Sequence, residues 1–206
     1  MNILKQNQSP DILDCIADLS NDEIFTSPKI ANKILDQLPE TIWKNPELKF
    51  LDPCSKTGVF LREIAKRLNH GLKNKIKDKR KRANHIFSKQ LFGISITEIT
   101  SLMSRRTLYY SKSASEINSA CNKFNSNSGN IFFKNYFHEW SKNGTCKKCG
   151  AKKNIFNRDI NRESYAYPFL HDKNIFLDMK FDVIIGNPPY QMEDGGFGKS
   201  ASPIYH

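Results

Sequence analysis

The chain has 206 residues, of which 38% are hydrophobic and 11% aromatic, so it can form a packed core and is not a disordered chain. It carries 32 basic and 21 acidic residues, a formal net charge of +11, and nucleic acid is therefore the first partner to consider. No segment approaches the ~18 consecutive apolar residues of a membrane-spanning helix, and no signal peptide is visible. An odd count of 5 cysteines suits reduced thiols better than a disulfide framework. We therefore expect a cytoplasmic protein with no membrane partner.

Strands and helices are expected to alternate along the chain. Residues 11–40 have a helical pattern, with a helix start at Ser27-Pro28 because proline is tolerated in a first helical turn. Another helix should follow Gly58, and a third should follow the second strand. Three apolar segments predict strands: 48–51, 91–96 and 181–185. Strands separated by helices predict a largely parallel α/β sheet, with ligands bound at the carboxyl ends of the strands.

Two segments do not follow this alternation. Residues 73–82 are almost entirely basic and are opposed only by Asp78. Such a run is either a solvated helix face or loop, or a patch that contacts phosphates, because clustered lysine and arginine release condensed counterions from DNA. Residues 122–130 are rich in asparagine, serine and glycine and predict a loop.

The sequence Asn187-Pro188-Pro189-Tyr190 directly follows the third predicted strand. Two prolines cannot extend a central strand, and they stiffen the backbone at its carboxyl end. On such a turn the Asn187 amide oxygen and a backbone carbonyl can accept hydrogen bonds from an amino group. The ring of Tyr190 can stack on the planar group that carries this amine. A plain strand-to-loop turn is the alternative interpretation.

Three segments, in this order along the chain, resemble the gamma class of DNA adenine-N6 methyltransferases, which are S-adenosylmethionine-dependent enzymes of restriction-modification systems. Phe25–Pro28 resembles the element that caps the methionine part of the cofactor, Phe50–Leu61 the cofactor-binding strand, loop and helix, and Asn187–Tyr190 the catalytic N-P-P-Y motif. The resemblance implies the N-terminal half of a Rossmann-like methyltransferase sheet with a small Cys/His insert. In this interpretation residues 1–206 form a partial catalytic domain with four parts: a cap at 9–40, a cofactor-binding half at 48–116, the insert at 137–172, and a catalytic strand and loop at 181–206.

The resemblance also implies a role for each matching residue. Asn187 and the Pro188 carbonyl would hold the adenine amino group, and Tyr190 would stack on an adenine flipped out of double-stranded DNA. Asp52 would orient the methionine amino group of S-adenosylmethionine. The implied catalytic residues are Asn187, Pro188, Pro189 and Tyr190. The implied cofactor-binding residues are Phe25, Thr26, Pro28, Asp52, Pro53, Thr57, Gly58, Phe60 and Glu98.

Two positions depart from the family pattern. Lys56 stands in the cofactor loop where many relatives have glycine. After the second strand the family usually has an acidic residue that binds the ribose hydroxyls, but this chain has Ser95, and the nearest carboxylate is Glu98. Either Glu98 reaches the ribose or the ribose is bound differently.

The insert holds most of the side chains that could bind a metal. Cys146 and Cys149 form a Cys-x-x-Cys turn that Gly150 helps to close, which is half of a structural zinc site. Because no second pair of this kind is present, the other ligands would come from His138, His171 or Cys121. A turn with two unligated thiols is the alternative, and a redox pair is disfavoured because the turn does not open a helix after a strand. We predict a Cys2His2 zinc site that consists of His138, Cys146, Cys149 and His171.

A complete sheet of this family has further strands after the N-P-P-Y motif, but only sixteen residues follow Tyr190 here. We therefore expect a truncated, frame-interrupted or split methyltransferase with little activity alone. Its expected partners are double-stranded DNA and a complementary C-terminal fragment or a restriction subunit. Two other functions remain open: methylation of a protein glutamine or an RNA base, and a non-enzymatic zinc-containing fragment that binds nucleic acid.

Overall fold

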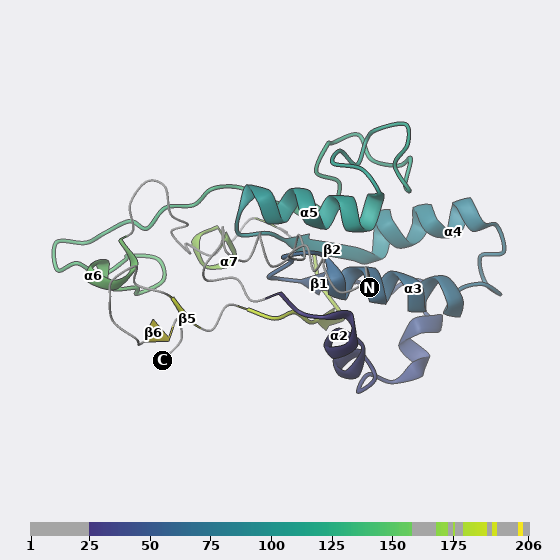
Figure 1. Cartoon of the computed structure of the whole chain (residues 1–206), viewed down its shortest axis with the longest axis horizontal. Coiled ribbons are helices and arrows are strands. Elements are labelled where there is room, and N and C mark those ends of the chain that lie inside the picture. Colours follow the sequence, from purple (N-terminus) through teal and green to yellow (C-terminus); the bar gives the residue numbers. More distant parts are fainter. Residues whose placement is uncertain are drawn as a thin grey trace, which may run out of the picture. The chain divides into compact units, whose positions relative to one another are not determined.

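The computed structural model describes residues 25–157, 168–172, 175, 179–188, 191–192 and 202–203 (Figure 1). The chain divides into two units. The larger unit, Thr26–Pro188, contains a parallel sheet and its helices, and the smaller unit comprises Met1–Phe25 and Pro189–His206. In the smaller unit, β5 (Gln191–Met192) pairs with β6 (Ser202–Pro203) in antiparallel orientation. Within the described ranges, every helix is too short or too polar to span a lipid bilayer.

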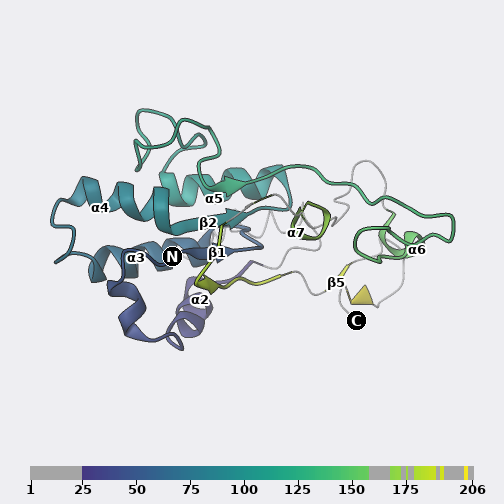
Figure 2. The same ribbon diagram turned by 180° about the vertical axis from the view of Figure 1, so that it is seen from behind.

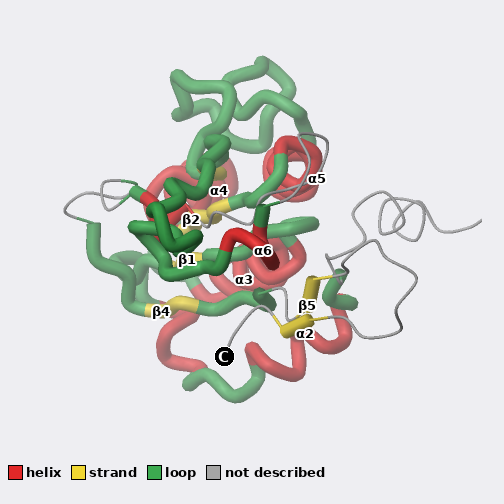
Figure 3. The backbone as a smooth tube through the Cα atoms, turned by 90° about the vertical axis from the view of Figure 1, so that its left-hand side faces the viewer, coloured by secondary structure: helices red, strands yellow, loops and turns green. Residues whose placement is uncertain are grey.

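Four short parallel strands form the sheet of the larger unit in the order β3-β2-β1-β4. Their bounds are β1 (Phe50–Asp52), β2 (Leu91–Ile94), β3 (Ile131–Phe132) and β4 (Val183–Ile184). Strand β1 is central, because Leu51 pairs with Phe92 on one side and with Ile184 on the other. Figure 3 shows β2, β1 and β4 in succession. This arrangement confirms the predicted α/β class with a Rossmann-like parallel sheet.

All three predicted strands are present, each shorter than its apolar segment. Strand β3 was not predicted, because its two residues are too few to establish an alternating pattern. It directly follows the predicted loop at 122–130, which contains no helix or strand. The sheet nevertheless extends to it, since the Gly93 N–H donates to the Asn130 carbonyl at 3.0 Å and the Ser95 N–H to the Phe132 carbonyl at 2.9 Å.

Several helices of the larger unit begin next to residues that favour helix starts. Ser27 accepts a hydrogen bond from the Ile30 N–H at the start of α2, Gly58 precedes α3, and Thr97 caps α5. Residues 11–24 of the predicted helical stretch lie outside the described residues. The helices are α2 (Pro28–Leu35), α3 (Val59–Gly71), α4 (Lys79–His85), α5 (Glu98–Tyr109), α6 (Lys153–Phe156) and α7 (Pro168–His171), with a 3-10 helix η2 (Glu40–Lys44) and a π-helical turn η3 (Ile86–Gln90).

Apolar side chains cover both faces of the sheet. On one face, Phe50 and Leu91 join the main core with side chains of α2, α3 and α5, and Figures 1 and 2 show α3 and α5 beside β1 and β2. On the other face, Leu51 and Phe92 pack against partly buried side chains from the segment before β4, among them Phe181. Successive strand residues thus point to opposite faces, as expected for a sheet that is covered on both sides.

The basic run at 73–82 lies near the amino-terminal edge of the sheet. Just after the run, the His85 Nε2 atom is 2.8 Å from the Pro46 carbonyl, and Gln90 Nε2 donates to the Leu48 carbonyl at 3.0 Å; both carbonyls precede β1. The guanidinium of Arg82 is buried and donates to Asn69 Oδ1 at 2.8 Å and to the Ile76 carbonyl at 2.6 Å, so it stabilises the fold. The other basic residues of the run are exposed.

Candidate active site and metal centre

A small hollow lies at the carboxyl ends of β1 and β4. Three segments that are distant in the sequence meet here: the residues before α2, the loop from β1 to α3, and the residues after β4. This is the edge at which an open parallel sheet binds its ligands. The described residues that line the hollow are Thr26, Asp52, Cys54, Lys56, Thr57, Gly58, Val59, Phe60 and Asn187.

The side chain of Asn187 connects two of these segments. Its Nδ2 atom donates a hydrogen bond to Thr26 Oγ1 at 2.9 Å, across 161 positions of sequence. The hydrogen bond places the amide of Asn187 at the hollow, beside the segment that precedes α2.

Asp52 is a buried carboxylate at the end of β1, with 2% of its surface exposed. Its Oδ1 atom accepts a hydrogen bond from the Cys54 N–H at 3.1 Å. Burial raises the pKa of Asp52 to about 7, although the Cys54 N–H and the charge of Lys56 act in the opposite direction. Gly186 lies against this carboxylate, since a Cβ atom at position 186 would overlap Oδ1. The carboxylate therefore fits only because the residue before Asn187 is glycine.

Serine hydroxyls hold the loop between β1 and α3 against its neighbours. The Ser55 N–H donates to the Ile94 carbonyl at 2.8 Å, and Ser95 Oγ donates to the Ser55 carbonyl at the same distance. Ser104 of α5 donates to the carbonyls of Ser55 and Lys56, each at 3.1 Å. These bonds fix the loop backbone relative to β2 and α5.

Gly58 allows α3 to start close to α5. Its φ of +74° lies in the left-handed region, which residues other than glycine rarely adopt. A Cβ atom here would also lie 3.0 Å from Leu108 Cδ1 and 3.1 Å from Ser104 Cα. Among the described residues, Gly58 at the N-cap position gives α3 no side-chain capping hydrogen bond.

Polar contacts fix α2, and with it the Thr26 segment, against α3. Asn32 donates to Glu63 Oε2 at 3.2 Å, and Arg67 donates to Asn32 Oδ1 at 3.0 Å. Burial would raise the pKa of the Glu63 carboxyl, but hydrogen bonds from Lys66, Asn32 and Arg62 lower it below its usual value. Glu63 is thus an ionised link between the two helices.

The structure brings together six of the predicted site residues at the hollow: Thr26, Asp52, Thr57, Gly58, Phe60 and Asn187. Four others are described but are not among its lining residues, namely Pro28, Pro53, Glu98 and Pro188. Phe25 belongs to the smaller unit, and Pro189 and Tyr190 lie outside the described residues. The roles of all these residues remain predictions.

The two departures from the family pattern have different environments. Lys56 is 6% exposed and lines the hollow. Ser95 is fully buried, with its hydroxyl bound to the Ser55 carbonyl, and Glu98 is exposed in the first turn of α5. Sequence reasoning did not select Cys54, Lys56 or Val59 as lining residues. All three belong to the segment that carries the resemblance, but the sequence could not show which of its side chains face the hollow.

The four predicted metal ligands lie together in the structure. The donor atoms of His138, Cys146, Cys149 and His171 are all within 4.8 Å of one another. Among them, Cys149 Sγ and His138 Nδ1 are 3.4 Å apart. Cys121, the other candidate, is buried elsewhere, with its sulfur 3.8 Å from the Asn84 carbonyl.

A tight turn presents the two cysteines. The Gly150 N–H donates to the Cys146 carbonyl at 3.0 Å, with Gly150 at a φ of +77°. The Cys146 N–H donates to the Ala151 carbonyl at 2.8 Å. The His138 ring stacks on Trp140, with ring centroids 4.7 Å apart, and lies 5.1 Å from the ring of His171 at the end of α7.

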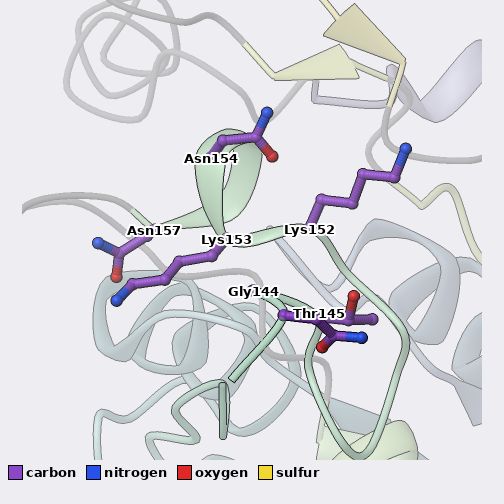
Figure 4. A pocket seen from close by; sticks show the side chains of 7 residues that line it. Gly144, Thr145, Lys152, Lys153, Asn154 and Asn157 are labelled. Atoms are coloured by element: carbon purple, nitrogen blue, oxygen red, sulfur yellow. The ribbon is translucent and has the colours of Figure 1, made fainter. Parts of the chain in front are cut away.

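The insert also has a cationic groove, which is shown in Figure 4. Its lining residues are Asn143, Gly144, Thr145, Lys152, Lys153, Asn154 and Asn157. Residues 134–157 contain six lysines and a single acidic residue, Glu139, which pairs with Lys148 at 2.8 Å. Residues 134–157 therefore carry an excess of positive charge, and the groove within them adds amide and hydroxyl groups.

Comparisons with known proteins agree with the geometry at the sheet edge. Residues 89–206 match the family described as Eco57I restriction-modification methylase. The chain is also 43% identical, over 222 residues, to a protein of Mycoplasma pneumoniae (strain ATCC 29342 / M129 / Subtype 1) described as an uncharacterized adenine-specific methylase. That match covers 95% of this chain and 53% of the relative, so the chain spans about half the length of the curated relative it matches. The two matches confirm the predicted resemblance.

Proposed function

Because the chain belongs to the Eco57I restriction-modification methylase family, we propose that it is the N-terminal, cofactor-binding part of an adenine-N6 DNA methyltransferase. The proposed donor is S-adenosylmethionine and the proposed acceptor is adenine in double-stranded DNA, within the cytoplasm. The observation that carries the proposal is the hollow in which Asn187, from the N-P-P-Y motif, meets Asp52 and Thr26, from the two cofactor segments.

The residues of the hollow fit S-adenosylmethionine. The Asp52 carboxylate is a buried acceptor suited to the ammonium group of the cofactor. The N-terminus of α3, which has no side-chain cap, offers N–H groups suited to its carboxylate. When bound, the cofactor supplies an electrophilic methyl group on a sulfonium. The chain's own contribution is to hold and orient the two reactants.

The proposed work of Asn187 is to orient the amine that accepts the methyl group. Its Oδ1 and the Pro188 carbonyl would accept hydrogen bonds from the two N–H groups of the adenine amino group. These bonds would reduce the conjugation of the nitrogen lone pair with the ring. Tyr190 would stack on the flipped base. Most of the rate enhancement would come from this alignment, since a well-oriented reactant pair avoids the entropic cost of a bimolecular encounter.

The cationic insert is the proposed contact with the DNA backbone. Its lysines and its groove provide the charge and the donors that phosphates bind, whereas no base-reading element is assigned. The exposed lysines of the basic run are less suited to this role, since the run lies near the amino-terminal edge of the sheet and the hollow lies at the carboxyl edge. The rest of the methyltransferase would be a further partner, in the same chain or as a separate polypeptide.

Two other functions were open from the sequence. Methylation of a protein glutamine or an RNA base would use the same amine-holding turn, but the matched family is a restriction-modification methylase and the relative is described as adenine-specific. A purely nucleic-acid-binding fragment would not need a buried carboxylate beside Asn187.

The test is transfer of labelled methyl groups to DNA. We expect little transfer by residues 1–206 alone, and activity in the completed enzyme, meaning this chain together with a complementary C-terminal half such as that of the M. pneumoniae relative. In the completed enzyme Asn187→Ala should abolish transfer while cofactor binding, measured by calorimetry, stays within a few-fold of the unmodified protein. Methylation of RNA or protein instead of DNA, or a fully active Asn187→Ala variant, would refute the proposal.

A further inference from the structure

We propose that His138, Cys146, Cys149 and His171 bind one structural zinc ion. This site is separate from the methyl-transfer hollow, and its existence does not depend on the proposed function.

The positions of the donor atoms are close to those of a zinc site. Tetrahedral coordination by two sulfurs and two nitrogens puts the donors about 3.4–3.8 Å apart. The pair Cys149 Sγ and His138 Nδ1 is already at 3.4 Å, and all four donors lie within 4.8 Å. Bringing the widest pairs to coordination distance needs a contraction of about 1 Å.

The environment of His171 points to a missing ligand. This side chain is only 7% exposed, and neither Nδ1 nor Nε2 has a hydrogen-bond partner of good geometry among the described residues, although the Phe137 backbone lies near the ring. Buried polar atoms are almost always paired, so an imidazole in this state needs an explanation. A bond from one ring nitrogen to a metal provides it.

The donor set selects the metal and the kind of site. Two thiolates and two imidazoles suit zinc, whereas magnesium and calcium prefer oxygen ligands. Four protein ligands leave no open position for a substrate, which is the pattern of a structural rather than a catalytic zinc.

The described part of the insert has few buried apolar side chains to hold it together. Between residues 134 and 172, only Cys146, Pro168 and His171 are buried among the described residues, and two of these are proposed ligands. The ion would join the cysteine turn to the end of α7. Tyr136 supports the same connection, because its hydroxyl donates to Asp172 Oδ2 at 2.6 Å. Small modules without a core commonly depend on a metal for their folding.

The direct test is the metal content of the full chain, purified without chelators and measured by elemental analysis. We expect about one zinc per chain. We expect the double variant Cys146→Ser/Cys149→Ser to retain less than about a tenth of this, and the matched control Cys121→Ser, which removes a buried thiol outside the cluster, to retain all of it. The variant His171→Cys preserves four ligands and should also keep about one zinc.

A second measurement does not depend on whether a variant folds. Wild-type chain stripped with a chelator and reloaded with cobalt(II) should show the intense visible absorption of a tetrahedral site with thiolate ligands, and zinc should displace it. Absence of zinc from the purified chain together with no such cobalt spectrum would overturn the proposal. A zinc content unchanged in the double cysteine variant would overturn it as well.

Discussion

The amide of Asn187 donates to the hydroxyl of Thr26 at 2.9 Å and so connects the loop after β4 to the residue that precedes the α2 cap. In the proposed enzyme these two residues belong to the acceptor side and the donor side of one reaction. Their hydrogen bond therefore couples the position of the amine to the position of the cofactor.

We expect Thr26→Val to lower the rate of methyl transfer in the completed enzyme by about 3- to 10-fold, the equivalent of one net hydrogen bond. Thr26→Ser keeps the hydroxyl and should retain nearly full activity. Single-turnover kinetics with saturating cofactor measures the effect. Equal rates for the valine and serine variants would show that the hydrogen bond does not orient Asn187.

Asp52 should make the stability of the free protein depend on pH. Its pKa is raised from an ordinary value of 3.8 to about 7 in the folded state, so the folded protein holds the proton more tightly than the unfolded chain does. The free energy of unfolding should therefore fall as the pH rises from about 4 to about 7, by at most on the order of 4 kcal/mol. Asp52→Asn removes this loss. Chemical denaturation at pH 5 and pH 8 should therefore show that the free energy of unfolding of the variant, relative to that of the wild type, is higher at pH 8 than at pH 5. Glu47→Gln, at an exposed carboxylate, serves as the control and should show no such gain.

Binding of the proposed cofactor should have the opposite pH dependence. The ionised form of Asp52 is the one that pairs with an ammonium group, so affinity should rise as the pH increases from 6 to 7.5, through a pKa of about 7. Calorimetric titration of S-adenosylmethionine across this range measures it. In the Asp52→Asn variant, affinity should be low and independent of pH. An affinity that falls with rising pH in the wild type would contradict the role assigned to Asp52.

Gly186→Ala tests the close packing behind Asp52. The added methyl group would overlap the carboxylate, and we expect a loss of about 1–3 kcal/mol in stability together with weaker cofactor binding. Gly144→Ala is the matched control: Gly144 has a φ of +76°, so the substitution strains the backbone, but Gly144 lies outside the hollow. The control should lose stability and keep its cofactor affinity. Unchanged cofactor affinity in Gly186→Ala would mean that Asp52 can move without consequence.

The two basic segments should differ in their effect on DNA binding. Replacing Lys152 and Lys153 by alanine should weaken binding and reduce the slope of log affinity against log salt by about 1.8, since each phosphate contact contributes about 0.9. Replacing Lys75 and Lys77, which are exposed in the basic run, should change the slope little. The measurement is the DNA affinity of both variants of the completed enzyme at several salt concentrations. A reduced slope in the Lys75/Lys77 variant and an unchanged slope in the Lys152/Lys153 variant would assign the phosphate contacts to the basic run.

The sequence was sufficient where local chemistry determines the structure. The Ser27-Pro28 helix start, the strand before Asn187 and the loop at 122–130 all follow from capping, β-branching and turn residues. It was insufficient where long-range packing decides. Strand β3 exists because β2 offers it a hydrogen-bonding edge, and the π-helical turn η3 has no sequence signal of its own.

The same contrast between local sequence and long-range packing applies to the metal cluster and to the basic run. Ligand spacing at Cys146 and Cys149 predicted a cluster that the fold then assembles with His138 and His171. By contrast, the sequence could not show that Arg82 is buried and makes hydrogen bonds within the fold, since its neighbours in the basic run look identical to it in charge. Burial is a property of the tertiary structure, and a charge pattern alone does not contain it.

The serine at the end of β2 has a consequence for ligand selectivity. Ser95 Oγ donates to the Ser55 carbonyl, and among the described residues that line the hollow Asp52 alone carries a carboxylate. A protein rejects an analogue that lacks a hydroxyl only when the loss leaves a buried acceptor or donor unpaired. If the exposed Glu98 does not reach the sugar of the proposed cofactor, analogues altered at the sugar should bind here with an affinity closer to that of the natural cofactor than they do in relatives with an acidic residue at this position. Sugar-modified nucleosides are therefore the class of compound from which to seek inhibitors that distinguish this protein from those relatives.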